Sequence, residues 1–173
     1  MKNNLNFDIK TEQNGAEVLD VSVAEWHELA LGGAEIPVTL RLNGCSMQPL
    51  IRKQKDAVTV VPVDRTLRKG DIVLFARSDG AYVVHRVRKI KGETVLTLGD
   101  NCVDFDAPMP ASQVWGLAVS LERNGKKICL DSAFSRACGR LRMATRPVRL
   151  LWKKLLRFGA RTKRKLVGKN GHN

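Results

Sequence analysis

The pattern that most constrains the fold lies between residues 38 and 130. Short segments rich in β-branched residues recur there, with no helical pattern between them, over residues 38–42, 57–63, 71–76, 81–90, 94–98, 114–121 and 126–130. Turn sequences such as Ser78-Asp-Gly80 and Arg123-Asn-Gly125 separate them. Short strands joined by such turns are typical of antiparallel sheets that curl into a barrel. We therefore predict a mainly β domain over residues 38–131, built as a partly open barrel.

A short helix is expected ahead of the strands. Ser22-Val-Ala-Glu25 has the spacing of a capping box, in which the serine hydroxyl and the glutamate carboxylate bind free amides of the first turn. Val23, Trp26 and Leu29 follow at helical spacing, and Gly32-Gly33 supplies a stop. Residues 1–37 are thus predicted to be a loose lead-in followed by an amphipathic helix of about three turns.

The charge of the chain is concentrated at its C-terminal end. The 173 residues carry a formal net charge of +13, yet the Lys/Arg and Asp/Glu of residues 1–131 cancel, and residues 132–173 contain no acid. This distribution argues against a uniformly basic protein that coats nucleic acid. We expect a neutral globular body with a basic appendage.

The appendage, residues 132–173, returns to a helical period, with Phe134 and Leu141 before Pro147 and Trp152 and Phe158 after it. Basic amphipathic helices of this kind dock on anionic membrane surfaces. A nucleic-acid arm is a second interpretation, weakened because aromatic residues make up only 5% of the chain and offer no platform for stacking bases. In a third interpretation the apolar stripe packs on the β domain and the basic end stays free.

The cysteines and the apolar segments exclude several classes of protein. Cys45, Cys102, Cys129 and Cys138 form no C-x-x-C pair, so we expect reduced, scattered thiols, no metal site and no cofactor. The N-terminal residues lack the apolar core of a secretory signal, and no window has the roughly 18 apolar residues of a membrane-spanning helix. A cytoplasmic protein is expected, peripheral at the inner face of the membrane if the tail docks there.

Three segments carry residues that could do chemistry together. Ser46 lies in a Gly-containing loop after the first predicted strand, and His85 is the one histidine inside the predicted β domain. A serine hydroxyl attacks a carbonyl only when a base takes its proton, and the imidazole, with an unperturbed pKa of about 6.5, can do so at neutral pH. Asp100, Asp104 and Asp106 follow, and a carboxylate can orient such an imidazole. Taken singly, each segment is more often a turn, a structural histidine or a cation-binding loop.

The order of four motifs makes the pattern specific. They are Gly44-x-Ser46-Met47-x-Pro49, Gly70-Asp71-Ile-Val73, Val84-His85-Arg86-Val87 and Gly99-Asp100-Asn101, with Asp106 beyond. In this order the chain resembles the signal peptidase I superfamily, which also contains the LexA-like self-cleaving proteins. The resemblance covers about residues 38–119. It implies a serine endopeptidase with the mainly β, partly barrel-like fold of that superfamily.

The resemblance also implies roles for individual residues. Ser46 matches the nucleophile, and His85 stands where many bacterial members have a lysine base, as in the histidine-using branch. Asp106 matches the acidic partner of that branch, with Asp100 second and Asp104 third. Gly44 occupies a position where bacterial relatives have a serine that assists the oxyanion, so slow or selective turnover is expected.

We therefore expect an enzyme that cleaves a leader or signal segment from a peptide or protein through an acyl-enzyme. The family's usual hydrophobic anchor is not found ahead of the Ser46 motif. A repressor is disfavoured because 37 residues are too few for a DNA-binding helix-turn-helix domain. The alternative is a non-catalytic module that keeps the fold and only binds peptides.

Overall fold

The computed structural model describes residues 22–145. The chain divides into two compact units, residues 1–139 and 140–173, and the described part of the second is residues 140–145. The domain boundaries expected after residues 37 and 131 stay predictions. Most of the predicted basic tail lies outside the described residues.

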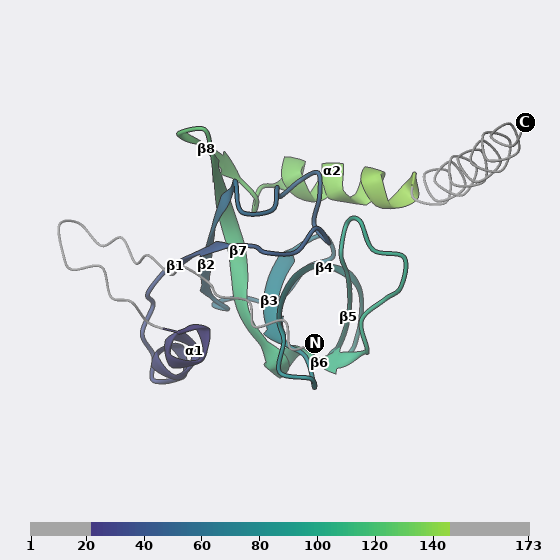
Figure 1. The fold of residues 1–173 in the computed structure, drawn as a ribbon. Coiled ribbons are helices and arrows are strands. Elements are labelled where there is room, and N and C mark those ends of the chain that lie inside the picture. The colour runs from purple at the N-terminus through teal and green to yellow at the C-terminus, as the bar shows by residue number, and fades with distance from the viewer. Residues whose placement is uncertain (1–21, 146–173) are drawn as a thin grey trace, which may run out of the picture. The chain divides into compact units, whose positions relative to one another are not determined.

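In the described residues the strands join in one antiparallel sheet (Figure 1). The strands are β1 (Val38–Arg41), β2 (Ala57–Pro62), β3 (Ile72–Ala76), β4 (Tyr82–Lys91), β5 (Thr94–Leu98), β6 (Met109–Pro110), β7 (Val114–Arg123) and β8 (Lys126–Cys129). Their order in the sheet is β1-β2-β7-β3-β4-β5-β6, with β8 also paired to β7. This confirms the predicted mainly β fold. Strand β6 was not predicted, because two residues are too few to show the alternation of side chains that marks a strand.

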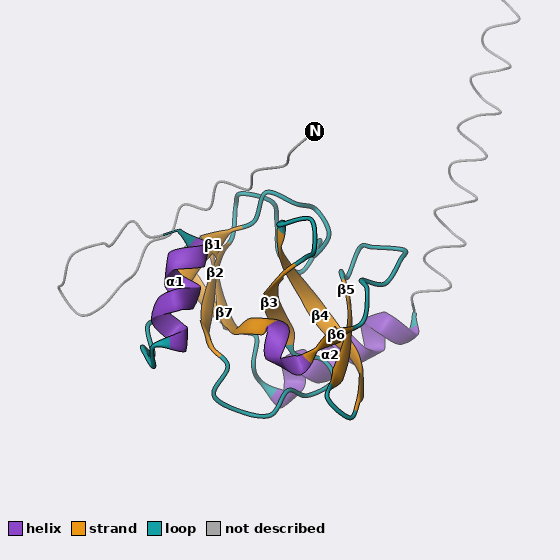
Figure 2. Ribbon diagram, turned by 90° about the horizontal axis from the view of Figure 1, so that it is seen from below, coloured by secondary structure: helices purple, strands orange, loops and turns teal. Residues whose placement is uncertain are grey.

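Strand β7 organises the sheet because both of its edges are hydrogen-bonded. Strand β2 pairs along one edge, where Thr59 faces Ser120. Strands β3 and β8 share the other edge: Val73 of β3 faces Leu117, and Cys129 of β8 faces Ser120. Figure 2 shows β7 between β2 and β3, with β4 and β5 following on the β3 side. The segment before β2 and strand β4, which follows β3, are thereby held in the same sheet structure.

Helix α1 (Val23–Leu31) begins at the predicted capping box. The Glu25 amide donates to Ser22 Oγ (3.2 Å), and the Ser22 amide donates to Glu25 Oε2 (2.6 Å). Trp26 is 1% exposed, and its indole N–H donates to the Ile36 carbonyl (2.7 Å). The ring packs so closely on β7 that a Cβ at Gly116 would lie 2.8 Å from it. Trp26 therefore fixes the helix to the sheet.

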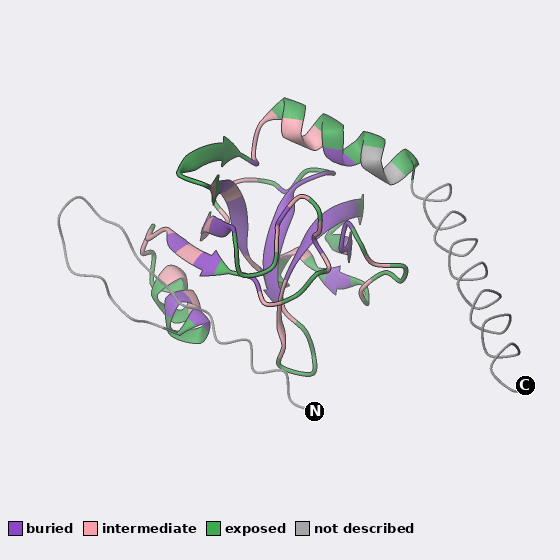
Figure 3. Ribbon diagram, turned by 45° about the horizontal axis from the view of Figure 1, so that its top comes forward, coloured by how far each residue is buried: buried purple, intermediate pink, exposed green. Residues whose placement is uncertain are grey.

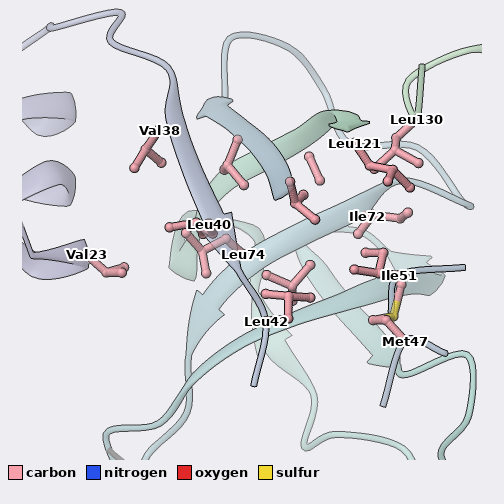
Figure 4. Close-up of a cluster of buried hydrophobic side chains, with 14 of the residues drawn as sticks. Val23, Val38, Leu40, Leu42, Met47, Ile51, Ile72, Leu74, Leu121 and Leu130 are labelled. Atoms are coloured by element: carbon pink, nitrogen blue, oxygen red, sulfur yellow. The ribbon is translucent and has the colours of Figure 1, made fainter. Parts of the chain in front are cut away.

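The buried side chains form two clusters. Ile72 and Leu74 of β3 belong to the first and Val73 and Phe75 to the second, so the clusters lie on opposite faces of the sheet. Figure 3 shows the buried residues concentrated along the strands. The first cluster joins Met47 and Ile51, from the segment between β1 and β2, with strand residues such as Leu40, Ile72 and Leu74 (Figure 4). Met47 and Ile51 are each 1% exposed. The residues that flank Ser46 are thus part of the core, which holds this non-strand segment against the sheet.

Helix α2 (Ala133–Ala144) bears out the helical pattern at the start of the basic tail. Its first turn is held by Arg136, which donates to the Asp131 carbonyl and carboxylate, both at 2.8 Å. Phe134, a member of the predicted apolar stripe, is 79% exposed. The stripe is therefore not packed on the β domain at Phe134, contrary to the third interpretation of the tail.

Replacing Trp26 by alanine should reduce the free energy of unfolding by about 3–5 kcal/mol, because it empties a buried site and leaves the Ile36 carbonyl unpaired. Urea denaturation of the full chain measures the loss. The control is Leu29→Ala on the same helix, where the side chain is 43% exposed and a change within about 0.5 kcal/mol is expected. Equal losses in the two variants would contradict the anchoring role of Trp26.

Candidate active site

Ser46 is half-buried in the segment that connects β1 and β2, and the core fixes the backbone on its C-terminal side. The Gln48 amide donates to the Cys45 carbonyl (3.2 Å) and the Ile51 amide to the Met47 carbonyl (3.0 Å), so two overlapping turns cover residues 45–51. The Gln48–Pro49 peptide bond within these turns is cis. The serine is therefore presented from a compact, anchored turn.

A buried carboxylate ties the end of this turn to β7. Asp56 is 0% exposed and accepts from the Arg52 amide (2.8 Å) and from Arg123 Nη2 (2.6 Å), which also donates to the Leu50 carbonyl (2.7 Å). Burial alone would raise the pKa of Asp56, but the hydrogen bonds from Arg123 and Arg52 hold it well below its usual range. The carboxylate is thus ionised at neutral pH and anchors the Ser46 segment through two arginines.

His85 lies on β4 opposite Val73 of β3 and is 2% exposed. Its Nδ1 is 2.6 Å from Asp106 Oδ2. The ring meets the edge of Phe75 with centroids 6.3 Å apart. A central strand, a buried aromatic ring and a carboxylate together leave the imidazole little freedom to turn.

Asp106 is held by more than His85. Its carboxylate also accepts from Thr97 Oγ1 (2.8 Å) and from Arg77 Nε (3.1 Å), and it forms an ion pair with Arg77 Nη2. Burial alone would raise the pKa of Asp106, but the hydrogen bond and charge of His85, with the bonds from Arg77 and Thr97, lower it to about 2. Since an ionised carboxylate only accepts, the proton on the imidazole lies at Nδ1 and Nε2 is left as the acceptor of the neutral ring.

Ser46 and His85 line one cleft of about 190 Å3. Apolar residues Leu42, Tyr82, Val83 and Val84 form much of its wall, with Asn43, Gly44, Arg77 and Cys102. Gly99 makes the close approach possible: a Cβ there would lie 2.8 Å from the Ser46 carbonyl oxygen and 2.9 Å from His85 Nε2. Any larger residue at position 99 would push the serine segment and the imidazole apart.

The other two candidate carboxylates lie elsewhere. Asp100 is 7% exposed and accepts from Arg86 Nε (2.9 Å) and Nη2 (2.8 Å), while Arg86 Nη1 donates to the Gly70 carbonyl (2.8 Å). On its other side the Arg86 guanidinium packs against Gly139 of α2, where a Cβ would lie 2.6 Å from Nη1. Asp104 is exposed. Of the three candidates, Asp106 alone is brought to His85.

The motif that contains Asp100 supports the serine segment directly. The Asn101 amide donates to the Ser46 carbonyl (2.7 Å), and Asn101 Nδ2 donates to the Cys45 carbonyl (3.2 Å). This role of Asn101 was not predicted from the sequence, and neither were the contacts of Arg77 and Thr97 with Asp106. A loop arginine and a strand threonine carry no signal in the sequence, because their partner is set by how the strands pair.

In the part of the chain that the structure describes, no three His, Cys, Asp or Glu side chains gather in a way that could hold a metal ion. Within residues 22–145 there is also no helix with the length and apolar character needed to cross a membrane.

The carboxylate of Asp106 should contribute stability that acid removes. Its pKa falls from an ordinary value of 3.8 to about 2 on folding, so its contribution is complete above pH 4 and is lost as the pH falls towards 2. Asp106→Asn should therefore weaken the fold at neutral pH by about 2 kcal/mol and flatten the loss of stability between pH 4 and pH 2. Urea titrations across this range measure both effects. The exposed Asp104→Asn is the control and should keep the wild-type dependence; a wild-type slope in Asp106→Asn would contradict the assignment.

Residues 20–102 match the family described as Peptidase S24-like, a stretch that contains Ser46 and His85 and ends before Asp106. The chain has no match among curated proteins. The mainly antiparallel fold is consistent with the same family. Over residues 20–102 the chain is thus similar to the Peptidase S24-like family.

Proposed function

We propose that this protein is a serine endopeptidase that removes a leader or signal segment from a peptide or protein, with Ser46 as nucleophile, His85 as general base and Asp106 as the acid that orients the base. The observation that carries the proposal is the contact of 2.6 Å between His85 Nδ1 and Asp106, made while His85 and Ser46 line one cleft. This is the chain of nucleophile, base and orienting carboxylate that acyl transfer requires.

In the proposed reaction His85 Nε2 takes the proton of Ser46 Oγ as the oxygen attacks the peptide carbonyl. The imidazolium that forms is stabilised by Asp106, which stays ionised because its pKa is about 2. The imidazolium then gives its proton to the leaving amine, and the acyl group stays on Ser46. Water, deprotonated by the same imidazole, hydrolyses the ester and restores the serine.

Arg77 supports the proposed role of Asp106 by holding the carboxylate oxygen Oδ1, which leaves Oδ2 for His85 and Thr97. Four charge-assisted or hydroxyl contacts fix the position of this buried carboxylate. The arrangement supports histidine, rather than lysine, as the base in this chain.

The oxyanion is the weak point of the proposed site. Backbone amides around Ser46 would have to hold it, because residue 44 is glycine and supplies no side-chain donor. A Cβ at Gly44 would lie 3.8 Å from Ser46 Oγ and 3.9 Å from the Ser46 amide, with no other atom of the described residues within 4 Å apart from those of residues 43–45. The position where relatives place a serine hydroxyl is therefore free.

The apolar cleft wall suits an extended peptide with small or apolar side chains beside the scissile bond. The preference for leaders or signal segments rests on the resemblance of the four motifs. A cytoplasmic location with docking at the inner membrane face through residues 132–173 also stays a proposal from sequence, and residues 146–173 of that segment lie outside the described part of the chain.

Ser46→Ala should lower the rate of peptide cleavage at least about 10³-fold without changing the fold, because the attacking oxygen is lost. Mass spectrometry of a mixed peptide library measures the rate. Ser78→Ala, an exposed serine between β3 and β4, is the control and should cleave as wild type. His85→Ala should resemble Ser46→Ala, because the group that takes the serine proton is lost. Unchanged cleavage in Ser46→Ala or His85→Ala would refute the corresponding role.

Gly44→Ser should raise kcat about 10-fold or more with little change in KM, because its hydroxyl adds a donor to the oxyanion. Gly44→Ala is the matched control: it adds the same Cβ without a donor, and no gain is expected. A gain in both variants would show that rigidity, not hydrogen bonding, limits the rate.

The alternative function, a module that binds peptides without turnover, predicts binding but no acyl-enzyme in intact-mass spectra of wild type or Gly44→Ser.

A further inference from the structure

Two cysteines that are distant in sequence lie on backbone segments that are hydrogen-bonded to each other beside the proposed nucleophile. Cys45 directly precedes Ser46 and is exposed, and Cys102 lines the same cleft as Ser46 and His85. Both are free thiols. The remaining cysteines of the described residues, Cys129 on β8 and Cys138 on α2, do not line this cleft.

The backbones that carry the two thiols are held together by hydrogen bonds. Asn101, the residue before Cys102, donates its amide to the Ser46 carbonyl (2.7 Å) and its side chain to the Cys45 carbonyl (3.2 Å). The Cys102 amide donates in turn to the Gly99 carbonyl (3.0 Å). A disulfide needs Cα atoms within about 7 Å of each other, and each cysteine here adjoins a residue bonded across the two segments.

The Cys102 sulfur is directed towards the serine segment. A Cβ at Gly99 would lie 2.7 Å from Cys102 Sγ and 2.8 Å from the Ser46 carbonyl oxygen, so the thiol and that oxygen flank the same point. Burial raises the pKa of the Cys102 thiol, and the charges of Asp106 and of Cys45 raise it further. Because Cys45 immediately precedes Ser46, the Cys102 thiol is directed towards the segment that carries Cys45.

We propose that Cys45 and Cys102 form a reversible intramolecular disulfide on reaction with a low-molecular-weight disulfide, and that this bond slows the peptidase. The bond formation is independent of the proposed function, whereas the effect on rate rests on it. The pair would make the cleft sensitive to the thiol–disulfide balance of its surroundings.

The chemistry balances with a small disulfide as oxidant. The exposed Cys45 makes the first attack as a thiolate, because burial and Asp106 disfavour the thiolate of Cys102. One sulfur of the small disulfide bonds to Cys45, and the other leaves as a thiol. Cys102 then loses its proton and attacks Cys45 Sγ, which expels the second small thiol. The protein loses two electrons and two protons, and the small disulfide gains them.

The expected effect on rate follows from the position of Cys45. It directly precedes Ser46, and the backbone amides around Ser46 are proposed to hold the oxyanion. A bond from Cys45 to the cleft wall fixes this short segment in one arrangement and pulls it towards Cys102. Small displacements of such donors cost large factors in rate. Reduction by an excess of thiol restores the open arrangement.

The bond itself is tested by peptide mapping of the full chain. The protein is equilibrated with mixtures of oxidised and reduced glutathione, alkylated in acid, digested without reductant and analysed by mass spectrometry. A single intramolecular Cys45–Cys102 cross-link is expected, with the thiols of Cys129 and Cys138 still alkylated. Cys129→Ser and Cys138→Ser should keep the cross-link, and Cys102→Ser should leave Cys45 as a mixed disulfide with glutathione. A mixed disulfide at Cys45 in wild type with Cys102 free, or a cross-link between two copies, would overturn the proposal.

The effect on rate is tested by peptide cleavage, with each variant compared with its own reduced form. Oxidised wild type should cleave at least about 10-fold more slowly than reduced wild type and recover in dithiothreitol. Cys45→Ser should cleave equally in both conditions, and Cys129→Ser should behave as wild type. A cross-link without a change of rate, or equal inhibition of Cys45→Ser, would refute the gating role. If no form cleaves any peptide, the proposed function fails, while the peptide map still decides whether the disulfide forms.

Discussion

Strand β7 is hydrogen-bonded along both of its edges, and these bonds hold together the two halves of the sheet on which the candidate site is built. On one edge, β2 follows the segment that carries Ser46; on the other, β3 leads into β4, which carries His85. Strands β2 and β3 do not pair with each other. Both pair with β7, which therefore fixes their relative positions in the sheet. The distance between the proposed nucleophile and base is therefore set by a strand that contributes no residue to the cleft.

Buried carboxylates join this sheet to its loops. Asp56 links the end of the Ser46 turn to β7 through Arg123, Asp100 links its loop to β4 through Arg86, and Asp106 links the same loop to His85. Each carboxylate loses hydration on burial, a cost that is offset only where several donors surround it. Such groups add little net stability compared with apolar contacts, but they specify one arrangement of segments that have no regular structure.

The surroundings of Ser46 combine features that favour chemistry with features that restrain it. The imidazole is fixed by a carboxylate that stays ionised well below neutral pH, which suits a general base. Gly44 leaves the oxyanion without a side-chain donor, and two thiols adjoin the nucleophile. These features fit the slow or selective turnover expected of the proposed peptidase.

Most of the secondary structure and the candidate site residues could be predicted from the sequence alone. Periodic β-branched segments predicted the longer strands, the capping box predicted the start of α1, and the ordered motifs identified Ser46 and His85 for the proposed roles. These features are local, so residue type and spacing are enough to reveal them.

The tertiary structure decided which carboxylate meets the histidine. His85 and Arg86 are neighbours on β4, so their side chains point to opposite faces of the sheet. The loop after β5 sends Asp106 to the face of His85 and Asp100 to that of Arg86, a choice that spacing along the chain does not encode. The same loop brings Cys102 beside the Ser46 segment, and Arg77 reaches Asp106 from the turn after β3. These contacts join residues far apart in sequence, and only the pairing of the strands brings them together.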